Sequence, residues 1–398
     1  MRHDVIIVGG GPAGTSAAIH LAMSGAQVLL VEQKRFPRPK LCGEFISPEC
    51  LVHFARLGVA DRMISAGGAT LARTIFYAPS GRHLTVPSEW FGAGAARGLS
   101  RAEMDNQLLR RAREVGVDVL DGAQAVGVQM DRGRVCGVRL KVEGRMYAYA
   151  SLVTIDATGR ARSLARRVEA ATGEKSAPRK ARFVAFKAHL DGARGAAQSC
   201  EIYSYRGGYG GLSEIEGGFS NLCFIVSAQD VRACDSDPER VMRTVVMSNR
   251  RAAYTLARAR ARTAWLSVAL EGFGAREPAP VEGMIAAGDA AAFIDPFTGS
   301  GMLMALESGA AAAAAIGCRL PALREGLGFA ALAADYRARY AEKFARRLRA
   351  SALLRRVAFA PPVAVEAALL ALSTSERMLR FLARATRQAS RLAEPETV

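Results

Sequence analysis

The sequence predicts an α/β fold with two interleaved domains and a helical tail, and three observations predict it. A β-branched run over residues 4–8 leads into a glycine-rich turn and an alanine-rich helical stretch. Alternating apolar residues within 73–96 and 179–275 are typical of strands. After Gly317, apolar side chains recur at helical spacing. Because 50% of the 398 residues are hydrophobic, the chain can build the core of more than one folding unit.

The first element is a βαβ unit of the kind that binds dinucleotides. Asp4 to Val8 is the expected first strand, a helix follows through Ser24, and residues 28–31 resume as a strand. Glycines between strand and helix let the chain turn sharply, let its backbone approach a pyrophosphate and let the helix pack on the strand. Glu32 ends the second strand, where a carboxylate can accept both hydroxyls of an adenosine ribose. An ordinary parallel βαβ unit is the alternative. The candidate binding residues are Gly9, Gly11, Pro12, Ala13, Gly14, Glu32 and Gln33.

The chain is strongly basic. It holds 54 Lys and Arg against 37 Asp and Glu, a formal charge of +17. Such a surface should attract phosphates, acidic lipids or an acidic carrier protein. We do not expect nucleic acid as a partner, because no nucleic-acid-binding module is recognisable and much of the excess is Arg in an Ala- and Arg-rich background.

The cysteines and the apolar segments of the chain indicate in which cellular compartment the protein is expected. The seven cysteines are odd in number and show no CxxC spacing, so we expect neither disulfides nor a metal site. Val5 to Val8 is too short for the apolar region of a signal peptide. Residues 357–372 come closest to a membrane span, but Pro361, Pro362 and Glu366 interrupt them. We therefore expect a cytoplasmic protein that does not span a membrane.

Three later segments follow the first unit in a distinctive order. Arg101 starts the sequence RAEMDNQLLRRA, which has helical character and carries Asp105. Taken alone, Arg101 would be an ordinary charge at a helix N-terminus. Residues 155–160 read IDATGR, a strand that ends in a glycine turn. Residues 287–301 read AGDAAAFIDPFTGSG and lead into an alanine-rich helix, with Pro296 suited to the turn before that helix.

Together these segments resemble the flavoprotein family that includes geranylgeranyl reductases, flavin-dependent halogenases and single-component aromatic hydroxylases, over residues 1 to about 320. The resemblance implies a glutathione-reductase-like FAD-binding Rossmann domain, an interleaved antiparallel-sheet substrate domain and a helical C-terminal tail. It assigns the FAD domain to 1–72, 97–178 and 276–318, the substrate domain to 73–96 and 179–275, and the tail to 319–398.

The resemblance also implies the cofactors. It predicts non-covalent FAD, with NADH or NADPH as a transient reductant and no metal, since a flavin carries the chemistry by itself. A strand-ending Gly-Asp pair can hold the ribityl chain, and a helix N-terminus can stabilise negative charge on the reduced flavin. The residues given cofactor-binding roles in this way are Arg101, Gly159, Gly288, Asp289, Pro296, Gly299, Ser300 and Gly301.

The loop over residues 37–44 reads PRPKLCGE and is similar to the PRxKxCG loop of geranylgeranyl reductase-like proteins. We expect it to border the flavin and to supply the candidate catalytic residues. A cation at Lys40 or Arg38 could stabilise charge that develops at the reacting centre, and Cys42 could donate a proton. The alternatives are a solvated loop that contacts only FAD phosphates, and a Cys42 that simply packs.

Two departures from the family affect the expected reaction. Residues 203–218 replace the PxxYxWxFP-type motif of the reductases, and neither Trp90 nor Trp265 lies in the WxWxIP motif of the halogenases. We therefore expect an NAD(P)H-dependent monooxygenase that hydroxylates an apolar or aromatic small molecule. An ene-reductase acting on an isoprenoid or lipid is the alternative, followed by a halogenase and then by a flavin-binding scaffold without enzymatic activity. The candidate substrate residues are Tyr203, Tyr205 and Tyr209, which could instead pack under a loop.

The tail is basic and helical, with 15 Lys and Arg against 7 Asp and Glu over residues 319–398. Its last part predicts an amphipathic helix whose apolar face caps the substrate domain while its arginines are solvated. Contact with a membrane surface or an acidic carrier protein is the alternative. The apolar positions are Met378, Phe381, Leu382, Ala385 and Ala389, opposite Arg380, Arg384, Arg387 and Arg391.

Overall fold

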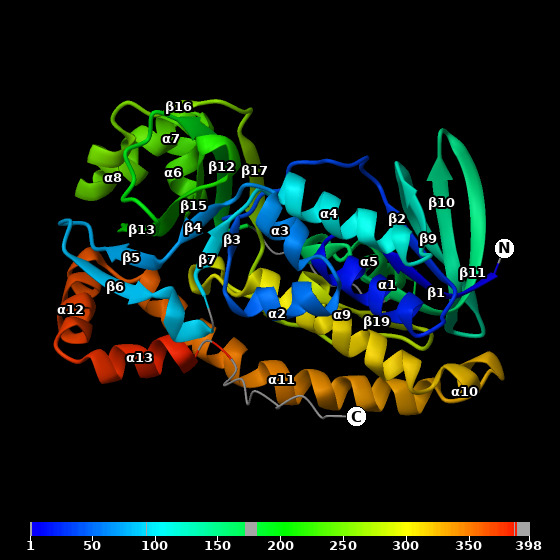
Figure 1. Ribbon diagram of the computed structural model, residues 1–398. Coiled ribbons are helices and arrows are strands. Elements are labelled where there is room, and N and C mark those ends of the chain that lie inside the picture. Colours follow the sequence, from blue (N-terminus) through cyan, green and yellow to red (C-terminus); the bar gives the residue numbers. More distant parts are fainter. Residues whose placement is uncertain (1, 93, 172–180, 386, 388–398) are drawn as a thin grey trace.

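The computed structural model describes residues 2–92, 94–171, 181–385 and 387, and it has the α/β fold that the sequence predicts. Two large sheets lie side by side, with helices between and below them (Figure 1). The C-terminal helices run along the underside of both. Ala389 and Arg391 of the expected last helix lie outside the described residues.

The first sheet is parallel at its centre and antiparallel at one side. Its order is β8-β2-β1-β11-β10-β9, with β19 paired to β11. Strand β1 is buried because helices and strands cover both its faces, which explains its unbroken β-branched sequence. The strands are β1 (Arg2–Val8), β2 (Val28–Glu32), β8 (Asp118–Asp121), β9 (Ala123–Asp131), β10 (Arg134–Val142), β11 (Arg145–Asp156) and β19 (Met284–Ala286).

Helices cover the first sheet, and two of them touch almost backbone to backbone. A Cβ added at Gly309 of α9 would lie 2.3 Å from the carbonyl oxygen of Ala13 in α1. Only glycine permits this approach, so the first glycine turn and the last helix of the domain share one core. The helices around this sheet are α1 (Pro12–Met23), α2 (Glu49–Arg56), α3 (Ala60–Ser65), α4 (Arg101–Glu114), α5 (Ser163–Ala171) and α9 (Gly301–Gly317).

The second sheet has the order β16-β12-β15-β14-β13-β5-β6, with β17 paired to β12. One face packs under α6 (Ala228–Ala233), α7 (Pro238–Thr244) and α8 (Arg250–Leu256). The other face turns toward the first domain (Figure 1). Its strands are β5 (Arg73–Tyr77), β6 (His83–Pro87), β12 (Phe183–Asp191), β13 (Ser199–Tyr205), β14 (Gly208–Glu214), β15 (Ser220–Ser227), β16 (Arg260–Ala261) and β17 (Leu266–Leu270).

Short elements join the two domains. Strands β3 (Phe45–Ile46), β4 (Ala69–Leu71) and β7 (Ala96–Gly98) form a small sheet at the junction. Strands β18 (Gly274–Ala275) and β20 (Ala292–Phe293) pair nearby.

The tail forms α10 (Leu320–Arg324), the long α11 (Phe329–Ala358), α12 (Pro362–Ser373) and α13 (Glu376–Ala385). The Tyr336 hydroxyl of α11 donates to the carbonyl oxygen of Ala286 at 2.7 Å, which fixes α11 under the first sheet. Among the described residues, no helix combines the length and apolar character needed to cross a bilayer.

Helix α13 buries only part of the expected apolar face, since Leu382 is partly buried but Met378 and Phe381 are exposed. Phe381 is 64% exposed, whereas Leu379 and Ala383 pack against the second domain. The sequence contains two apolar stripes, and helical spacing alone cannot say which one finds a partner. Arg380 is also not simply solvated, because its guanidinium lies 4.9 Å from the centroid of the Trp90 ring.

Candidate active site

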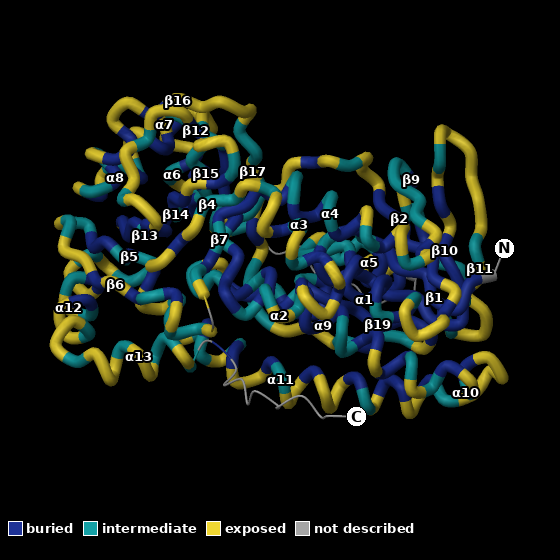
Figure 2. The backbone as a smooth tube through the Cα atoms, in the orientation of Figure 1, coloured by how far each residue is buried: buried dark blue, intermediate teal, exposed yellow. Residues whose placement is uncertain are grey.

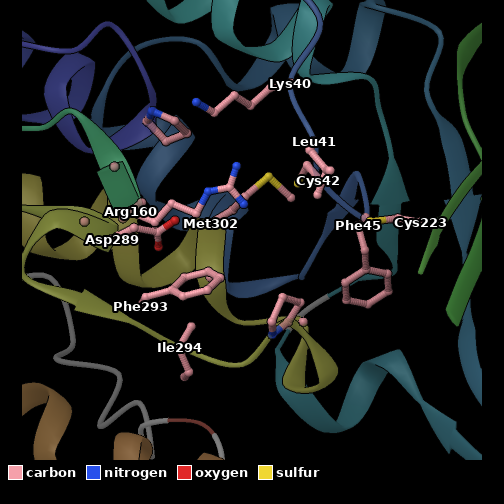
Figure 3. Close-up of a pocket in the computed structure, with 18 of the residues that line it drawn as sticks. Lys40, Leu41, Cys42, Phe45, Arg160, Cys223, Asp289, Phe293, Ile294 and Met302 are labelled. Carbon is pink, nitrogen blue, oxygen red and sulfur yellow. The ribbon is translucent and has the colours of Figure 1, made fainter. Parts of the chain in front are cut away.

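A cavity of about 680 Å³ lies where the two domains meet. The first domain supplies its polar end through the glycine turn, the loop over residues 37–44 and the turns after β11 and β19. The second sheet supplies the roof, since alternate residues of its strands point toward the first domain. Figure 3 shows Lys40, Arg160 and Asp289 toward one side of this cavity, and Cys42, Phe45 and Cys223 toward the other.

The glycine turn after β1 has a distinct structural requirement at each position. A Cβ at Gly14 would lie 1.9 Å from the carbonyl oxygen of Gly9, and a Cβ at Gly9 would lie 2.2 Å from that of Ala157. Both contacts are impossible for other residues, so these glycines hold the turn together. At Gly11, by contrast, the atom nearest to an added Cβ would be Nη2 of Arg101, at 3.7 Å. The backbone of Gly11 is therefore open to the cavity.

Glu32 lies at the end of β2 and is already well held. Its carboxylate accepts hydrogen bonds from the backbone N–H groups of Gly10 and Lys34, each at 3.0 Å. Arg38 donates to the same carboxylate at 3.3 Å. Since a carboxylate offers about four acceptor positions and three are used, one remains for a ribose hydroxyl.

Arg101 opens α4 and is buried beside Asp105. Its Nε and Nη2 donate to the two carboxylate oxygens at 2.8 and 2.7 Å. Burial by itself lowers the pKa of the Arg101 guanidinium, but the Asp105 charge outweighs it and raises that pKa overall. Nη1 of Arg38 lies 3.2 Å from the same carboxylate, so Arg38 and Arg101 share Asp105. The two arginines form a fixed cationic end to the cavity.

Asp289 follows β19 in the short turn Gly288–Ala290 and faces three cations. Burial raises the pKa of its carboxyl, although Arg160, Arg101 and Lys40 all act to lower it. Lys40 is open to the cavity, yet the surrounding protein desolvates it, and its pKa is lowered first by that desolvation and then by Arg38, Arg101 and Arg160. The pKa of Arg160 is also lowered by burial, against the charge of Asp289.

The turn before α9 is tied to the roof. The Asp295 carboxylate accepts from the backbone N–H of Phe297 at 3.0 Å and from the Tyr209 hydroxyl of β14 at 2.5 Å. Burial raises the pKa of Tyr209 well above its ordinary value, and the neighbouring Asp295 adds to this. Gly299 has φ 62°, where a side chain would be strained, and it lets the chain turn into the N-terminus of α9. That N-terminus can stabilise a negative charge placed at the cavity.

The loop over residues 37–44 crosses from β2 to the roof, and Glu44 anchors its end. Glu44 is fully buried and has φ 53°, a left-handed conformation that is strained for a residue other than glycine. Its carboxylate accepts from Nζ of Lys187 at 2.5 Å, from Nε2 of His189 at 2.7 Å and from the backbone N–H of Arg101 at 2.8 Å. Asn221 also donates to the carbonyl oxygen of Cys42 at 3.2 Å. These bonds hold Cys42 and its neighbours against the cavity.

Beyond the polar end, the cavity continues as an apolar arm toward the tail. Leu354 of α11, Leu369 and Leu372 of α12, and Leu379 and Leu382 of α13 line this arm. Phe76 and Phe297 stand where the arm begins, with their ring centroids 5.5 Å apart. The lining of the arm therefore suits an apolar ligand.

The structure brings most of the sequence-predicted cofactor residues to this cavity. All of them line it except Gly14 and Ser300, which pack behind the two glycine turns. Lys40, Cys42 and Arg38 line it too, although Arg38 lies at the Glu32 end. Their catalytic roles stay predictions.

Of the three tyrosines expected at the substrate, the structure places one at the cavity. Tyr209 lines it, whereas Tyr203 and Tyr205 are buried under the helices of the second domain. Their neighbour Ile202 points into the cavity instead, because successive side chains of β13 face opposite sides of the sheet.

Sequence reasoning missed the Glu44, Lys187 and His189 group. The signal was present, since two charged or polar side chains interrupt the apolar strand FVAFKAHL at alternate positions. Buried charges are expected to have partners, so such a pattern indicates a carboxylate on the facing element. The sequence does not show which carboxylate that is.

The residues present fit FAD. The exposed backbone at Gly11 is a cradle that a side chain would fill, and the fixed cations Arg38 and Arg101 match a diphosphate. Among the described residues, neither Lys40 nor Arg160 forms an ion pair, so both are available to a bound anion. Asp289 can accept from a ribityl or ribose hydroxyl.

Comparisons with known proteins agree with this reading of the site. The sequence matches the FAD binding domain family over residues 2–346. The menaquinone reductase of Mycolicibacterium smegmatis is 29% identical over 327 residues, which cover 78% of this chain and 76% of that protein. Digeranylgeranylglycerophospholipid reductase 1 of Methanococcoides burtonii is 26% identical over 315 residues, 77% of this chain and 72% of that protein. Digeranylgeranylglycerophospholipid reductase 2 of Methanopyrus kandleri is 35% identical, over 40% of this chain and 38% of its own length.

Solved structures share the fold. A geranylgeranyl bacteriochlorophyll reductase-like protein from Thermoplasma acidophilum superposes with a TM-score of 0.80 at 20% identity, covering 96% of each chain. The flavin-dependent brominase Bmp2 superposes with a TM-score of 0.79 at 21% identity, covering 97% of this chain and 93% of its own. Because the family match spans most of the chain and the residues that line the cavity fit FAD, this protein belongs to the FAD-binding domain family and is an FAD-dependent oxidoreductase.

Proposed function

We propose that the protein uses NADH or NADPH to reduce a carbon–carbon double bond in a long, isoprenoid-type apolar molecule. The observation that carries the proposal is the apolar arm, which continues the cavity from its cofactor end and is lined by leucines of α11, α12 and α13. Two relatives aligned over about three quarters of this chain support it, since their names describe reductases of an isoprenoid lipid and of menaquinone.

Bound FAD would supply hydride chemistry, and the chain's own residues would do the rest. The cations Arg101, Arg160 and Lys40 bind and orient the anionic cofactor. The leucines of the arm exclude water from the reacting centre and align the substrate chain. Cys42, whose Sγ accepts from the backbone N–H of Glu44, is the proposed source of the proton that passes to the substrate carbon, and Glu44 keeps its loop in place.

The proposal is tested by anaerobic turnover. The FAD-loaded protein is incubated with NADPH or NADH and a long-chain polyprenyl alcohol, without oxygen. We expect a product that gains one pair of hydrogens for each reduced double bond, measured by mass spectrometry. Oxidation of the reduced flavin that does not depend on the added polyprenyl alcohol would contradict the proposal.

A second candidate is the monooxygenase predicted from the sequence, and one observation favours it. The rings of Phe76, Tyr209 and Phe297 pack against one another at the cavity wall, Tyr209 meeting Phe297 edge to face at 5.2 Å. Such a wall suits stacking of a planar aromatic substrate. This candidate requires oxygen. Turnover in ¹⁸O-labelled oxygen would then place one labelled atom in the product, whereas the reductase incorporates none.

A further inference from the structure

Helix α12 is an exposed helix without a polar face. A helix at a protein surface ordinarily presents charged and polar side chains to solvent. The exposed positions in the middle of α12 are Val363, Ala364, Ala367, Leu370 and Ala371. Val363 is 80% exposed and Leu370 is 51% exposed. The one charged residue of the helix, Glu366, is turned sideways, where it accepts from the backbone N–H of Ser80 at 2.8 Å. This exposed apolar stripe calls for a partner that is itself apolar.

Helix α13 follows α12, packs against it and carries exposed arginines. Arg380 pairs with Glu376 of the same helix and lies over the Trp90 ring. The contact with Trp90 fixes the helix on the second domain. Arg377, Phe381 and Arg384 follow one another at spacings of four and three residues, so they share the outward side. Within the described part of the chain, neither Arg377 nor Arg384 pairs with a carboxylate. Figure 2 shows that both helices are exposed along the outer edge of the molecule.

The inner faces of the same two helices line the apolar arm of the cavity. Leu369 and Leu372 of α12 and Leu379 and Leu382 of α13 face inward. The exposed apolar stripe and the arm therefore lie on opposite sides of the same helix, α12. Val357, at the end of α11, lines the cavity and is still 37% exposed. The wall of the arm is thus thin and apolar on both sides at this corner.

We propose that this docking face, made of Val363, Leu370, Arg377, Phe381 and Arg384, binds the surface of an anionic bilayer. Helix α12 lies at the boundary between headgroups and acyl chains, while Arg377 and Arg384 contact anionic headgroups. An apolar substrate then passes from the bilayer into the arm between α12 and α13. The passage of substrate rests on the proposed function, whereas binding to the bilayer does not.

Charge and chemistry favour a bilayer over a second copy of this chain. Residues 353–385 hold five arginines and two glutamates, and the whole chain carries +17, so two such faces would repel each other. An anionic bilayer offers both an apolar layer for the stripe and negative charge for the arginines. The apolar substrate of the proposed function would also partition into a bilayer.

The test is flotation of the full-length, FAD-loaded protein with lipid vesicles. Vesicles of phosphatidylcholine alone are compared with vesicles that also contain phosphatidylglycerol. We expect binding to the mixed vesicles, weakened by salt, and little binding to phosphatidylcholine. V363S/L370S should lower the partition coefficient at least about tenfold by removing apolar burial. R377E/R384E should lower it by a similar factor through lost attraction to the headgroups.

Matched controls change equally exposed residues elsewhere. Leu327 is 64% exposed and Met146 is 58% exposed, so L327S/M146S repeats the apolar change away from the face. R132E/R206E repeats the charge reversal at two exposed turns. Both controls should bind vesicles like the parent. Failure of the parent to float with mixed vesicles, or an equal loss in the controls, would overturn the proposal.

Two further outcomes distinguish bilayer binding from self-association and from the proposed function. If the parent self-associates through the face without binding vesicles, and V363S/L370S abolishes the association, the occupant is a second copy and the proposal fails. If the protein binds vesicles through the face but reduces no polyprenyl alcohol, the docking face stands and the proposed function falls.

Discussion

The Glu44 carboxylate accepts a hydrogen bond from Nζ of Lys187 at 2.5 Å, and this contact joins the cofactor loop of one domain to the roof of the other. Both side chains are buried, Glu44 at 0% and Lys187 at 2% exposure. A buried pair of this kind is costly to break, because removal of one partner leaves the other charge without compensation.

We expect Glu44→Ala to destabilise the protein by about 3–5 kcal/mol, since it strands Lys187 and also frees His189. Chemical denaturation of the FAD-loaded protein measures the change. Arg62→Ala is the matched control, because Arg62 and Glu114 form an ion pair at the surface, where solvent screens their attraction. A Glu44→Ala protein as stable as the control would show that the pair adds nothing to stability.

The same residue predicts a pH dependence. Burial raises the pKa of Glu44, but the hydrogen bond from His189 and the charge of Lys187 outweigh it, so its pKa lies below the ordinary value of 4.5. A depressed carboxyl pKa contributes stability above the unfolded-state pKa and loses it as the pH falls through the folded-state pKa. The parent should therefore lose stability between the unfolded pKa and the lower folded pKa. Glu44→Gln should show a flatter profile there in calorimetry or denaturant titration.

Substitutions at two glycines should separate cofactor binding from folding. Gly11→Leu should give a folded, colourless protein, because its side chain would occupy open cavity space that we assign to the pyrophosphate. Gly14→Ala should instead lower the melting temperature, because its Cβ would meet the carbonyl oxygen of Gly9 at 1.9 Å. Flavin absorbance and thermal unfolding report the two effects. Parental FAD affinity in Gly11→Leu would remove the basis for placing the cofactor there.

Asp289→Ala should weaken FAD binding by about one to two orders of magnitude, because it removes a charge-assisted hydrogen bond worth roughly 1.5–3 kcal/mol. Burial raises the pKa of this carboxyl, so in the parent the affinity should begin to fall at a pH above the ordinary Asp range as the pH is lowered. Asp289→Asn should lack that pH dependence. Quenching of flavin fluorescence gives the affinities, and an unchanged affinity in Asp289→Ala would make the turn merely structural.

Lys40→Met discriminates between two roles of the cation that faces the cavity. If Lys40 acts on the reacting centre, turnover slows while FAD occupancy is retained. If it holds the cofactor phosphates, occupancy falls first and turnover follows it. We expect the second result, because Arg38, Arg101 and Arg160 surround Lys40 at the cationic end of the cavity. Normal turnover together with normal occupancy would contradict both roles.

Tyr209→Phe and Tyr203→Phe should behave differently although both remove one buried hydroxyl. Tyr209 bonds Asp295 in the turn before α9, so its loss should alter KM or kcat of the substrate reaction. Tyr203 bonds Glu201 under the helices of the second domain, so its loss should cost about 1 kcal/mol of stability and leave turnover unchanged. Steady-state kinetics and denaturation of the two variants make the comparison.

The part of the site that depends on local backbone geometry could be predicted from the sequence. Gly9 and Gly14 are needed because neighbouring carbonyl oxygens leave no space for a Cβ, and such requirements recur wherever this turn forms. Glu32 could be predicted as well, because its role depends on its place at the end of β2. Arg101 and Asp289 could be assigned to the cofactor site only from the order of the motifs along the chain. Taken alone, each is an ordinary helix or turn residue.

The part that depends on tertiary packing could not be predicted. Glu44 and Lys187 are 143 positions apart, and nothing local to either one names the other. The exchange of Tyr203 for Ile202 at the cavity reflects which face of β13 is covered by helices, and alternation gives two faces without saying which is which. Phe381 was placed on the wrong side of α13 for the same kind of reason.

The contact between Gly309 and Ala13 has a consequence for how the protein is made. Synthesis proceeds from the N-terminus, so β1 and α1 leave the ribosome some 270 residues before β19 and α9, which complete their sheet and cover their helix. The whole second sheet is synthesised in that interval. Until then α1 is not covered by α9, and β5 of the second sheet likewise has to wait for β13, with which it pairs. The cofactor can therefore be captured only near the end of translation, when β19 and the turn before α9 complete the cavity.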